Sequence, residues 1–230
     1  MRTLSKGAEC PALKLWKRNN RASPQNIHYD NLDSATREAI IQRLIEEQAG
    51  LCAYTMKSIS HSNGKWQAHI EHILPRTAHA DKSVTWSNLV ACIPKPGAHC
   101  PFGAVQKGAY DPNDADKLFV KPTQGGMSRH FRFRENGEIE GLTPEARDTI
   151  DENVLHLNHS ELVNDRKAKI QAAIHRRPSA AEALRRAEDL RKKDRNGHLE
   201  PYCEAVAQVL EAYANRIAAK GARLAGAARR

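Results

Sequence analysis

The stretch His69-Ile70-Glu71-His72-Ile73-Leu74-Pro75 decides the fold that we expect, because it places three ionisable side chains within four residues, beside apolar anchors. As a strand it places His69 and Glu71 on one face, since side chains alternate along a strand. An imidazole and a carboxylate on one face can bind a hard or borderline cation. His72 then points the other way, and it joins the same site only if the strand ends or bulges at Glu71, which Pro75 favours. The alternative is an exposed polar strand with a satisfied histidine.

Three of the five cysteines flank this stretch, at Cys52, Cys92 and Cys100. Three thiolates and one nearby imidazole can make a tetrahedral zinc site. The spacing is not that of a Cys-x-x-Cys knuckle, because Thr55 stands three residues after Cys52 and seven residues separate Cys92 from Cys100. We therefore expect buried, metal-free cysteines, with a structural zinc site as the alternative. An odd, widely spread set also predicts no disulfide bonds.

Downstream, Trp86-Ser87-Asn88-Leu89-Val90-Ala91-Cys92 places an asparagine directly before an apolar run. An asparagine side chain can bridge backbone groups across a loop and hold two strands at a fixed distance. Asn88 is therefore a candidate brace for this loop. The alternative is an ordinary turn residue.

Outside residues 51–108 the pattern is mainly helical. Asp33 or Ser34 caps a predicted helix that ends at Gly50. Alternation predicts strands at residues 118–120 and 131–133, with an Asn136-Gly137 turn after the second and a loop at residues 122–128. Further helix starts are predicted at Thr143-Pro144, at Ser160, at Ser179 with Glu182 as a capping box, and at Pro201, with a break at Asn196-Gly197, an end near Gly221 and a fraying tail at residues 222–230.

These elements predict an α+β protein with three parts. They are an N-terminal helical segment (1–50), a central part with short strands that holds the ionisable cluster (51–142), and a basic helical C-terminal region (143–230). No apolar stretch approaches the ~18 residues of a membrane span, and the first residues lack the apolar segment of a secretory signal. We expect a soluble, cytoplasmic protein with no membrane partner.

The charge balance favours a polyanionic partner. The 230 residues carry a net charge of +9, with 36 Lys and Arg against 27 Asp and Glu. Residues 160–230 account for +7 of this charge, and the isoelectric point is near 9.4. The candidate nucleic-acid contacts in this region are Arg185, Arg186, Arg191, Lys192 and Lys193. The alternatives are a solvated helix face and a protein-docking surface.

The residues Cys52-Ala53-Tyr54, the stretch from His69 to Pro75, Trp86-Ser87-Asn88-Leu89 with Cys92, and Lys107-Gly108 resemble the motif of the HNH endonuclease family. The segments Met1-Arg2, Lys6-Gly7, Glu47-Gln48-Ala49-Gly50, and Leu155-His156-Leu157-Asn158 with Arg166 are similar to the PtuB branch of that family, the nuclease component of Septu anti-phage defence systems. The resemblance covers roughly residues 1–170. It implies a ββα-metal, treble-clef-like core embedded in a mainly helical protein with a C-terminal helical extension.

The resemblance also implies roles for the central residues. His72 corresponds to the general base that takes a proton from the attacking water, a task that suits a neutral imidazole. Glu71 corresponds to the metal-binding acid, and His69 lies beside it as a ligand or a support. Asn88 corresponds to the residue that holds the catalytic loop. Oxygen and imidazole ligands favour Mg²⁺ or Mn²⁺ as the cation.

The chain departs from the family pattern at the last metal-binding position, because residues 102–107 contain neither His nor Asn. The candidates for a third ligand are His99, Gln106 and Asp111. Lys107 and Arg76 are the candidate phosphate contacts near the cluster.

The expected function is metal-dependent hydrolysis of phosphodiester bonds, in DNA by default, with structured RNA such as tRNA as the other substrate class. The implied partners are a PtuA-like ATPase and, in retron-linked systems, a reverse transcriptase with its RNA/DNA product. The rival hypothesis is a catalytically weak or inactive treble-clef module that docks an ATPase or binds nucleic acid.

Overall fold

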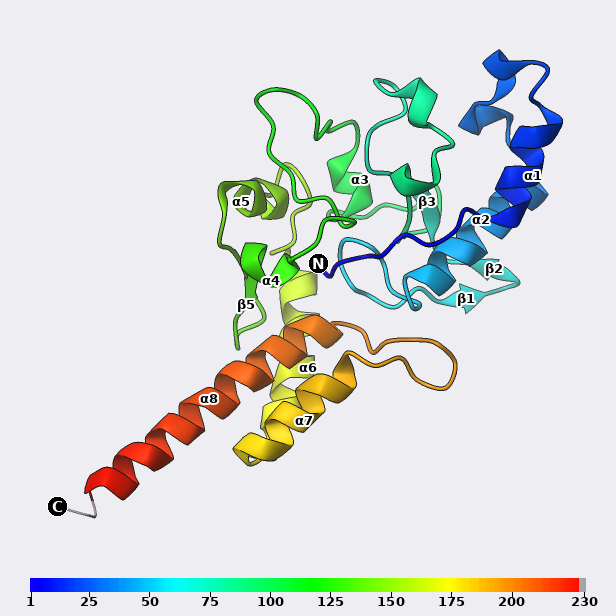
Figure 1. Cartoon of the computed structure of the whole chain (residues 1–230). Helices are drawn as coiled ribbons and strands as arrows, with labels where there is room; N and C mark the ends of the chain where they lie inside the picture. Colours follow the sequence, from blue (N-terminus) through cyan, green and yellow to red (C-terminus); the bar gives the residue numbers. More distant parts are fainter. Residues whose placement is uncertain (228–230) are drawn as a thin grey trace.

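The computed structural model describes residues 1–227, and over this range the chain is an α+β protein of helices and short antiparallel hairpins (Figure 1). The helices are α1 (Pro11–Asn19), α2 (Ser34–Glu47), α3 (Ala104–Lys107), α4 (Met127–His130), α5 (Pro144–Ile150), α6 (Ser160–Ile174), α7 (Ala180–Leu190) and α8 (Cys203–Ala227). The strands are β1 (His61–Ser62), β2 (Lys65–Trp66), β3 (His69–His72), β4 (Leu89–Cys92), β5 (Phe131–Phe133) and β6 (Ile139–Gly141), paired β1–β2, β3–β4 and β5–β6. Short 3-10 turns lie at Pro24–Asn26, Tyr29–Asn31, Ala80–Lys82 and Trp86–Asn88.

Helix α2 forms as the sequence predicts and supports the central hairpin. Asp33 caps it by accepting a hydrogen bond from the backbone N–H of Thr36 at 2.8 Å. Just past its end, the buried side chain of Gln48 donates to the carbonyl oxygens of Leu51 and Ala91. The same amide accepts a hydrogen bond from the N–H of Ala91 at 2.7 Å. Gln48 thus pairs with β4 as a neighbouring strand would.

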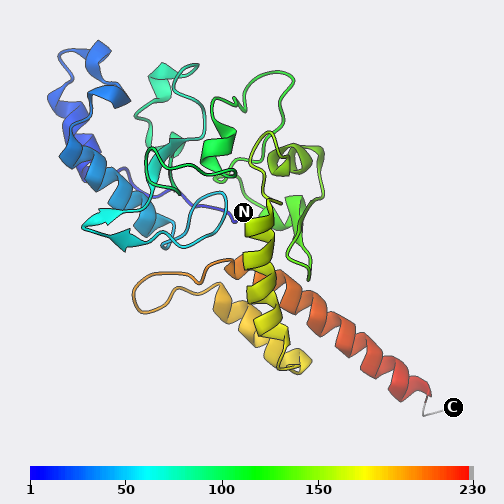
Figure 2. The ribbon, with the colours of Figure 1, turned by 180° about the vertical axis from the view of Figure 1, so that it is seen from behind.

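The central hairpin joins β3 to β4 in antiparallel register, with His69 opposite Cys92 and His72 opposite Leu89. All four residues of β4 are buried, as expected for a strand covered on both faces. The one-turn helix α3 follows the hairpin in the chain, and it lies beside β3 in both views (Figures 1 and 2). Two antiparallel strands and a helix therefore surround the predicted cluster.

A second hairpin, β5–β6, is held by a polar side chain from each of two later segments. The side chain of Asn158 accepts from the N–H of Ile139 and donates to its carbonyl oxygen, both at 2.9 Å. Arg166, which is buried on α6, donates to the carbonyl oxygens of Gly137 at 2.6 Å and Leu157 at 2.8 Å. The predicted strand at residues 131–133 and the turn at Asn136-Gly137 are confirmed.

The predicted strand at residues 118–120 is wrong, because this segment pairs with no strand in the described part of the chain. Side chains take up its backbone groups instead. The hydroxyl of Tyr110 donates to the carbonyl oxygen of Leu118, and the N–H of Val120 donates to the hydroxyl of Thr149. Phe119 and Val120 are buried, whereas Leu118 is exposed. The apolar residues of this segment therefore mark its packing against the core and not a strand.

From residue 160 onward the described chain is a group of three helices, with α7 and α6 packed against α8 (Figure 2). The capping box of Ser179 and Glu182 at the start of α7 is confirmed. The last helix begins at Cys203, two residues after the predicted Pro201, and it runs past Gly221 to Ala227. Its far end projects from the body of the molecule (Figure 1). The end of the predicted tail, residues 228–230, lies outside the described residues.

Buried apolar residues from the N-terminal segment to α8 form one cluster, so the three predicted parts share a core. All five cysteines are buried and free. None of the helices in residues 1–227 combines the length and the apolar character needed to cross a bilayer.

We expect Gly137→Ala to destabilise the protein far more than Gly64→Ala. Both glycines have positive φ, +89° and +70° respectively, so left-handed strain of about 1 kcal/mol is common to the two variants. A Cβ at Gly137 would lie 2.2 Å from the carbonyl oxygen of Val163, whereas nothing lies within 4 Å at Gly64. Urea denaturation should show an additional loss of about 3 kcal/mol for Gly137→Ala. Equal losses would contradict the close packing of this turn on α6.

Candidate active site

The predicted cluster lies in a cleft of about 790 Å³ on the side of β3 that is open to solvent. Its walls come from segments far apart in the sequence. They are lined by His28, Tyr29 and Asp30, by His69, Ile70, Glu71 and His72 of β3, by Pro75, Arg76 and Thr77, by residues Lys95, Pro96, Gly97 and Ala98, and by Val105, Gly108 and Ala109 at α3. All three ionisable residues of the strand line this one cleft, although the alternation of side chains predicts opposite directions for Glu71 and His72. The strand does not end at Glu71 as that arrangement was expected to require, because His72 is still paired with Leu89 as the last residue of β3.

His72 is held as a buried, neutral imidazole. Its Nε2 lies 2.8 Å from the carbonyl oxygen of Ser83. Because a carbonyl oxygen only accepts, Nε2 carries the proton and Nδ1 keeps its lone pair. Burial lowers the pKa of His72 to about 4, and the positive charges of Arg76 and Lys107 add to this effect against the opposing hydrogen bond to Ser83. The imidazole is therefore uncharged at neutral pH and can accept a proton.

His69 and Glu71 each present one unengaged donor atom. Nδ1 of His69 lies 2.6 Å from the carbonyl oxygen of Pro94, so it is protonated and Nε2 has the free lone pair. Metal-bound histidines commonly have this second hydrogen bond to a carbonyl. Oε1 of Glu71 lies 3.0 Å from Nζ of Lys107 and accepts from the hydroxyl of Tyr54 at 3.5 Å. Oε2 has no hydrogen-bond partner among the described residues.

Lys107 has a different position from the one predicted. Its side chain is 1% exposed, and its ammonium bonds to the carboxylate of Glu71 and to the carbonyl oxygen of His72, both at 3.0 Å. A buried ammonium with these two partners cannot contact an incoming phosphate from the surface. We correct the predicted phosphate contact accordingly: Lys107 orients Glu71 and links α3 to β3.

Asn88 makes the contacts expected of a loop brace. Its side-chain oxygen accepts from the N–H of Leu74 at 2.8 Å, and its amide donates to the carbonyl oxygens of Leu74 and Lys82. The residue therefore closes the loop that connects β3 to β4. The same loop contains Ser83, whose carbonyl holds His72.

Sequence patterns did not reveal the opposite wall of the cleft. The ring of Tyr29 meets the ring of His72 edge-on, at 4.8 Å between centroids and 87° between planes. The guanidinium of Arg76 lies 4.7 Å above the Tyr29 ring and forms an ion pair with Asp30. The backbone N–H of Tyr29 donates to the hydroxyl of Ser83. No periodicity or motif marks residues 28–30, because their placement depends on tertiary contacts.

The three candidates for a third ligand are not brought to the cleft. His99 is exposed, and the amide of Gln106 donates to the carbonyl oxygen of Glu152 at 2.7 Å. Asp111 pairs with Nε2 of His79 at 2.7 Å. Within residues 1–227, no group of three or more His, Cys, Asp and Glu side chains is close enough together to hold a metal ion.

Of the three cysteines considered as zinc ligands, Cys52 and Cys92 lie beside each other and Cys100 has a different partner. Burial raises the pKa of Cys52, but hydrogen bonds from Cys92, Thr55 and the backbone outweigh it and lower the pKa to about 6. The thiol of Cys100 instead donates to the carbonyl oxygen of Phe102 at 3.3 Å. Thr55, where a knuckle would have its second cysteine, is buried.

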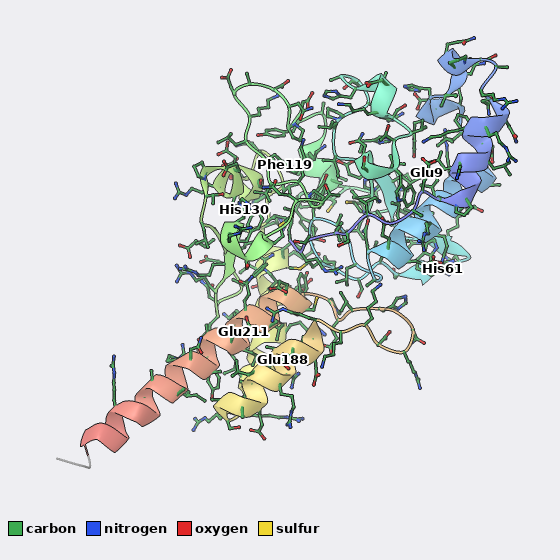
Figure 3. The ribbon with its side chains drawn as sticks, viewed as in Figure 1. Glu9, His61, Phe119, His130, Glu188 and Glu211 are labelled. Carbon is green, nitrogen blue, oxygen red and sulfur yellow. The ribbon has the colours of Figure 1, made fainter. Side chains whose placement is uncertain are left out.

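The predicted basic contacts of the C-terminal region lie apart from this cleft. Arg185, Arg186 and Lys193 are exposed, and Lys192 pairs with Asp189. Arg191 is the exception that needs correction, because it forms ion pairs with Glu204 and with Glu211 on α8, the latter labelled in Figure 3. A guanidinium bound to two carboxylates fastens the end of α7 to α8 and is not free for phosphate.

No model of a known protein family matches this chain, and no curated protein matches it either.

The free energy of unfolding should fall as the pH is lowered, because His72 takes up a proton more readily in the unfolded chain than in the folded chain. The folded pKa of about 4 lies below the ordinary value of 6.5, so between these values the unfolded chain binds a proton that the folded chain does not. This stability is fully present above pH 6.5 and is lost as the pH falls through 4. We expect a loss of about 2 kcal/mol between pH 7 and pH 5 that His72→Gln lacks, measured by urea denaturation. A pH dependence unchanged by the substitution would contradict the buried neutral imidazole.

Replacing Lys107 should destabilise the folded protein, because it leaves the carboxylate of Glu71 without its ion-pair partner. The side chains of this pair are 1% and 14% exposed, so Lys107→Met should cost about 3 kcal/mol. The double variant Glu71→Gln/Lys107→Met should recover most of that loss, because it leaves no unpaired charge. Lys117→Met is the control, since its pair with Asp114 is exposed to solvent and contributes little to stability. Thermal and urea unfolding measure all three variants; a double variant that is no more stable than Lys107→Met would contradict the pairing.

Proposed function

We propose that this chain is a divalent-metal-dependent endonuclease of the HNH type, which hydrolyses phosphodiester bonds in nucleic acid. The observation that carries the proposal is that His72, Glu71 and His69 line one cleft, each with one side-chain atom held by the protein and another without a hydrogen-bond partner among the described residues. The chain order of β3, β4 and α3 supports it, because the HNH core that the sequence resembles has two antiparallel strands followed by a helix.

His72 is the general base in this proposal. Its tautomer is set by the carbonyl of Ser83, so Nδ1 is the atom that takes the proton from water as the water attacks phosphorus. Burial and two nearby cations hold its pKa low before substrate binds. An anionic phosphate in the cleft would raise that pKa toward neutrality, because it favours the charged imidazolium. The base is therefore uncharged when water must be deprotonated and is better able to hold the proton afterwards.

Glu71 and His69 would hold the divalent cation. A carboxylate oxygen and an imidazole nitrogen are a suitable partial donor set for Mg²⁺ or Mn²⁺, since such ions keep several water or phosphate oxygens and need only one or two protein ligands. The bound cation supplies neutralisation of the scissile phosphate and of the departing 3′ oxygen. Lys107 and Tyr54 restrain one oxygen of Glu71 and leave the other for the metal.

Arg76 is the phosphate contact that the cleft supports. Its guanidinium lines the cleft and stacks over Tyr29, and its present partner is the exposed carboxylate of Asp30. A surface ion pair of this kind is weak, so a phosphate oxygen can replace Asp30 at little cost. Lys95 is a second exposed cation that lines the cleft.

The biological setting is proposed from the resemblance. The outer residues that resemble PtuB form one network beneath β4: Lys6 binds Glu47 and the carbonyl oxygen of Leu89, and Gln48 binds Ala91. From the resemblance we propose an effector of a Septu-type defence system that acts with a PtuA-like ATPase, and in retron-linked systems with a reverse transcriptase and its RNA/DNA product. DNA is the default substrate, and structured RNA such as tRNA is the other.

A catalytically inactive interaction module is the second candidate. The observation that favours it is that His99, Gln106 and Asp111 do not line the cleft, which leaves two protein donors for the cation. Such a module would dock an ATPase or bind nucleic acid through the same fold.

A cleavage assay decides between the two candidates. DNA and total RNA are incubated with Mg²⁺ or Mn²⁺ against EDTA, with the protein alone and with a PtuA-like ATPase. His72→Ala should lower the rate at least about 100-fold, because it removes the general base. Glu71→Ala should lower both the rate and the affinity for Mn²⁺ measured by calorimetry. His175→Ala, an exposed histidine at the end of α6, should leave both unchanged.

Two outcomes would overturn parts of this proposal. Cleavage that persists in His72→Ala would remove His72 as the base. No cleavage under any combination, with retained binding to the ATPase, would favour the interaction module.

A further inference from the structure

A second groove, of about 960 Å³, lies between the end of α6, helix α7 and the loop at residues 191–202. It shares no residue with the cleft at β3. Three separate chain segments each contribute two adjacent cations to it: Arg176 and Arg177 after α6, Arg185 and Arg186 on α7, and Lys192 and Lys193 after α7.

Most of these cations are unpaired, whereas most of the groove's carboxylates are engaged. In the described part of the chain only Lys192 of the six has an ion-pair partner, Asp189. Of the other carboxylates, Glu182 accepts from the N–H and hydroxyl of Ser179, and Asp194 accepts from the backbone N–H groups of Asn196 and His198. Glu200 is the remaining acid. The six cations outnumber the four carboxylates, so the groove has a formal net charge of +2, and five of its cations have no ion-pair partner in the described part of the chain.

The aliphatic side chains that line the groove are buried, and the other apolar residues in its lining are the half-buried Pro178 and Pro201. Ala173 is 3% exposed, and Leu190 and Leu199 are each 6% exposed. A docked peptide usually gains its affinity from aromatic or aliphatic anchors in open pockets, and these buried side chains leave none. Binding here must come from charge, which favours a ligand with closely spaced anions along its length.

The backbone that carries two of the cations, Arg185 and Arg186 on α7, is fixed at both ends of the helix. Arg191 fixes the end of α7 to α8 through Glu204 and Glu211. The capping box of Ser179 and Glu182 fixes its start. A ligand therefore has to order the side chains of Arg185 and Arg186 but not the helix backbone that carries them.

We propose that this groove binds the phosphate backbone of nucleic acid, without regard to sequence, as an anchor separate from the cleft. Arginine forms bidentate hydrogen bonds to phosphate oxygens, and four of the six cations are arginines. The anchor requires no chemistry at His72, so it stands even in a chain whose cleft does not cut.

Binding is measured in the full chain with His72→Ala, so that no cleavage interferes. The groove variants are Arg185→Gln/Arg186→Gln and Arg176→Gln/Arg177→Gln. The matched control is Arg18→Gln/Arg21→Gln, which removes the same charge from two exposed arginines at α1 that have no ion pair in the described residues. Circular dichroism checks that each variant keeps its helices.

The probes are two unrelated DNA duplexes of about 20 base pairs and one RNA hairpin, followed by fluorescence anisotropy between about 50 and 200 mM salt. Each groove variant should bind every probe at least about tenfold more weakly, and the slope of log affinity against log salt should fall by about 2. The control should keep nearly the full affinity and slope.

Unchanged affinity and slope in the groove variants, or an equal loss in the control, would overturn the anchor. So would binding of a poly-glutamate peptide that depends on the groove while nucleic-acid binding does not, because the groove would then serve an acidic protein. Failure of the nuclease proposal is seen separately, as absence of cleavage by the chain with His72 intact.

Discussion

The central hairpin depends on the buried amide of Gln48. It is 1% exposed, and it makes three hydrogen bonds to backbone groups of Leu51 and Ala91. Because an unsatisfied buried amide is costly, these bonds allow one position of α2 against β4. β4 in turn pairs with β3, the strand that carries His69, Glu71 and His72. The geometry of the cleft is therefore set from a residue that does not touch it.

The cleft shows how backbone carbonyls prepare side chains for chemistry. The carbonyls of Ser83 and Pro94 each accept from one imidazole nitrogen, and in doing so they leave the other nitrogen of His72 and His69 with its lone pair. Asn88 closes the loop that positions the first of these carbonyls. The buried ammonium of Lys107 pairs with one oxygen of the Glu71 carboxylate and holds it in place. The electrostatic result is a neutral base beside an oriented acid.

The C-terminal helices use their charges in two different ways. Arg191, Glu204 and Glu211 neutralise one another and join α7 to α8. The arginine pairs at residues 176–177 and 185–186 stay exposed and converge on one groove. A count of charges along the sequence treats both kinds alike, although only the second is available to a partner. Together with the cleft, the groove gives the chain two separate surfaces suited to phosphate.

Local patterns were sufficient for features that depend on neighbours in the chain. Asp33, Ser179 with Glu182, and Thr143 with Pro144 marked helix starts correctly, because a cap bonds within its own first turn. The strand from His69 to His72 followed from its alternation. Alternation misled at residues 118–120, where burial and side-chain hydrogen bonds replace strand pairing.

The sequence by itself therefore determined the local elements and the residue types at the cleft. The tertiary structure alone decided that Tyr29 packs on His72, that Lys107 is buried against Glu71 and that Arg191 is neutralised, because these contacts join segments whose separation along the chain encodes no spacing rule.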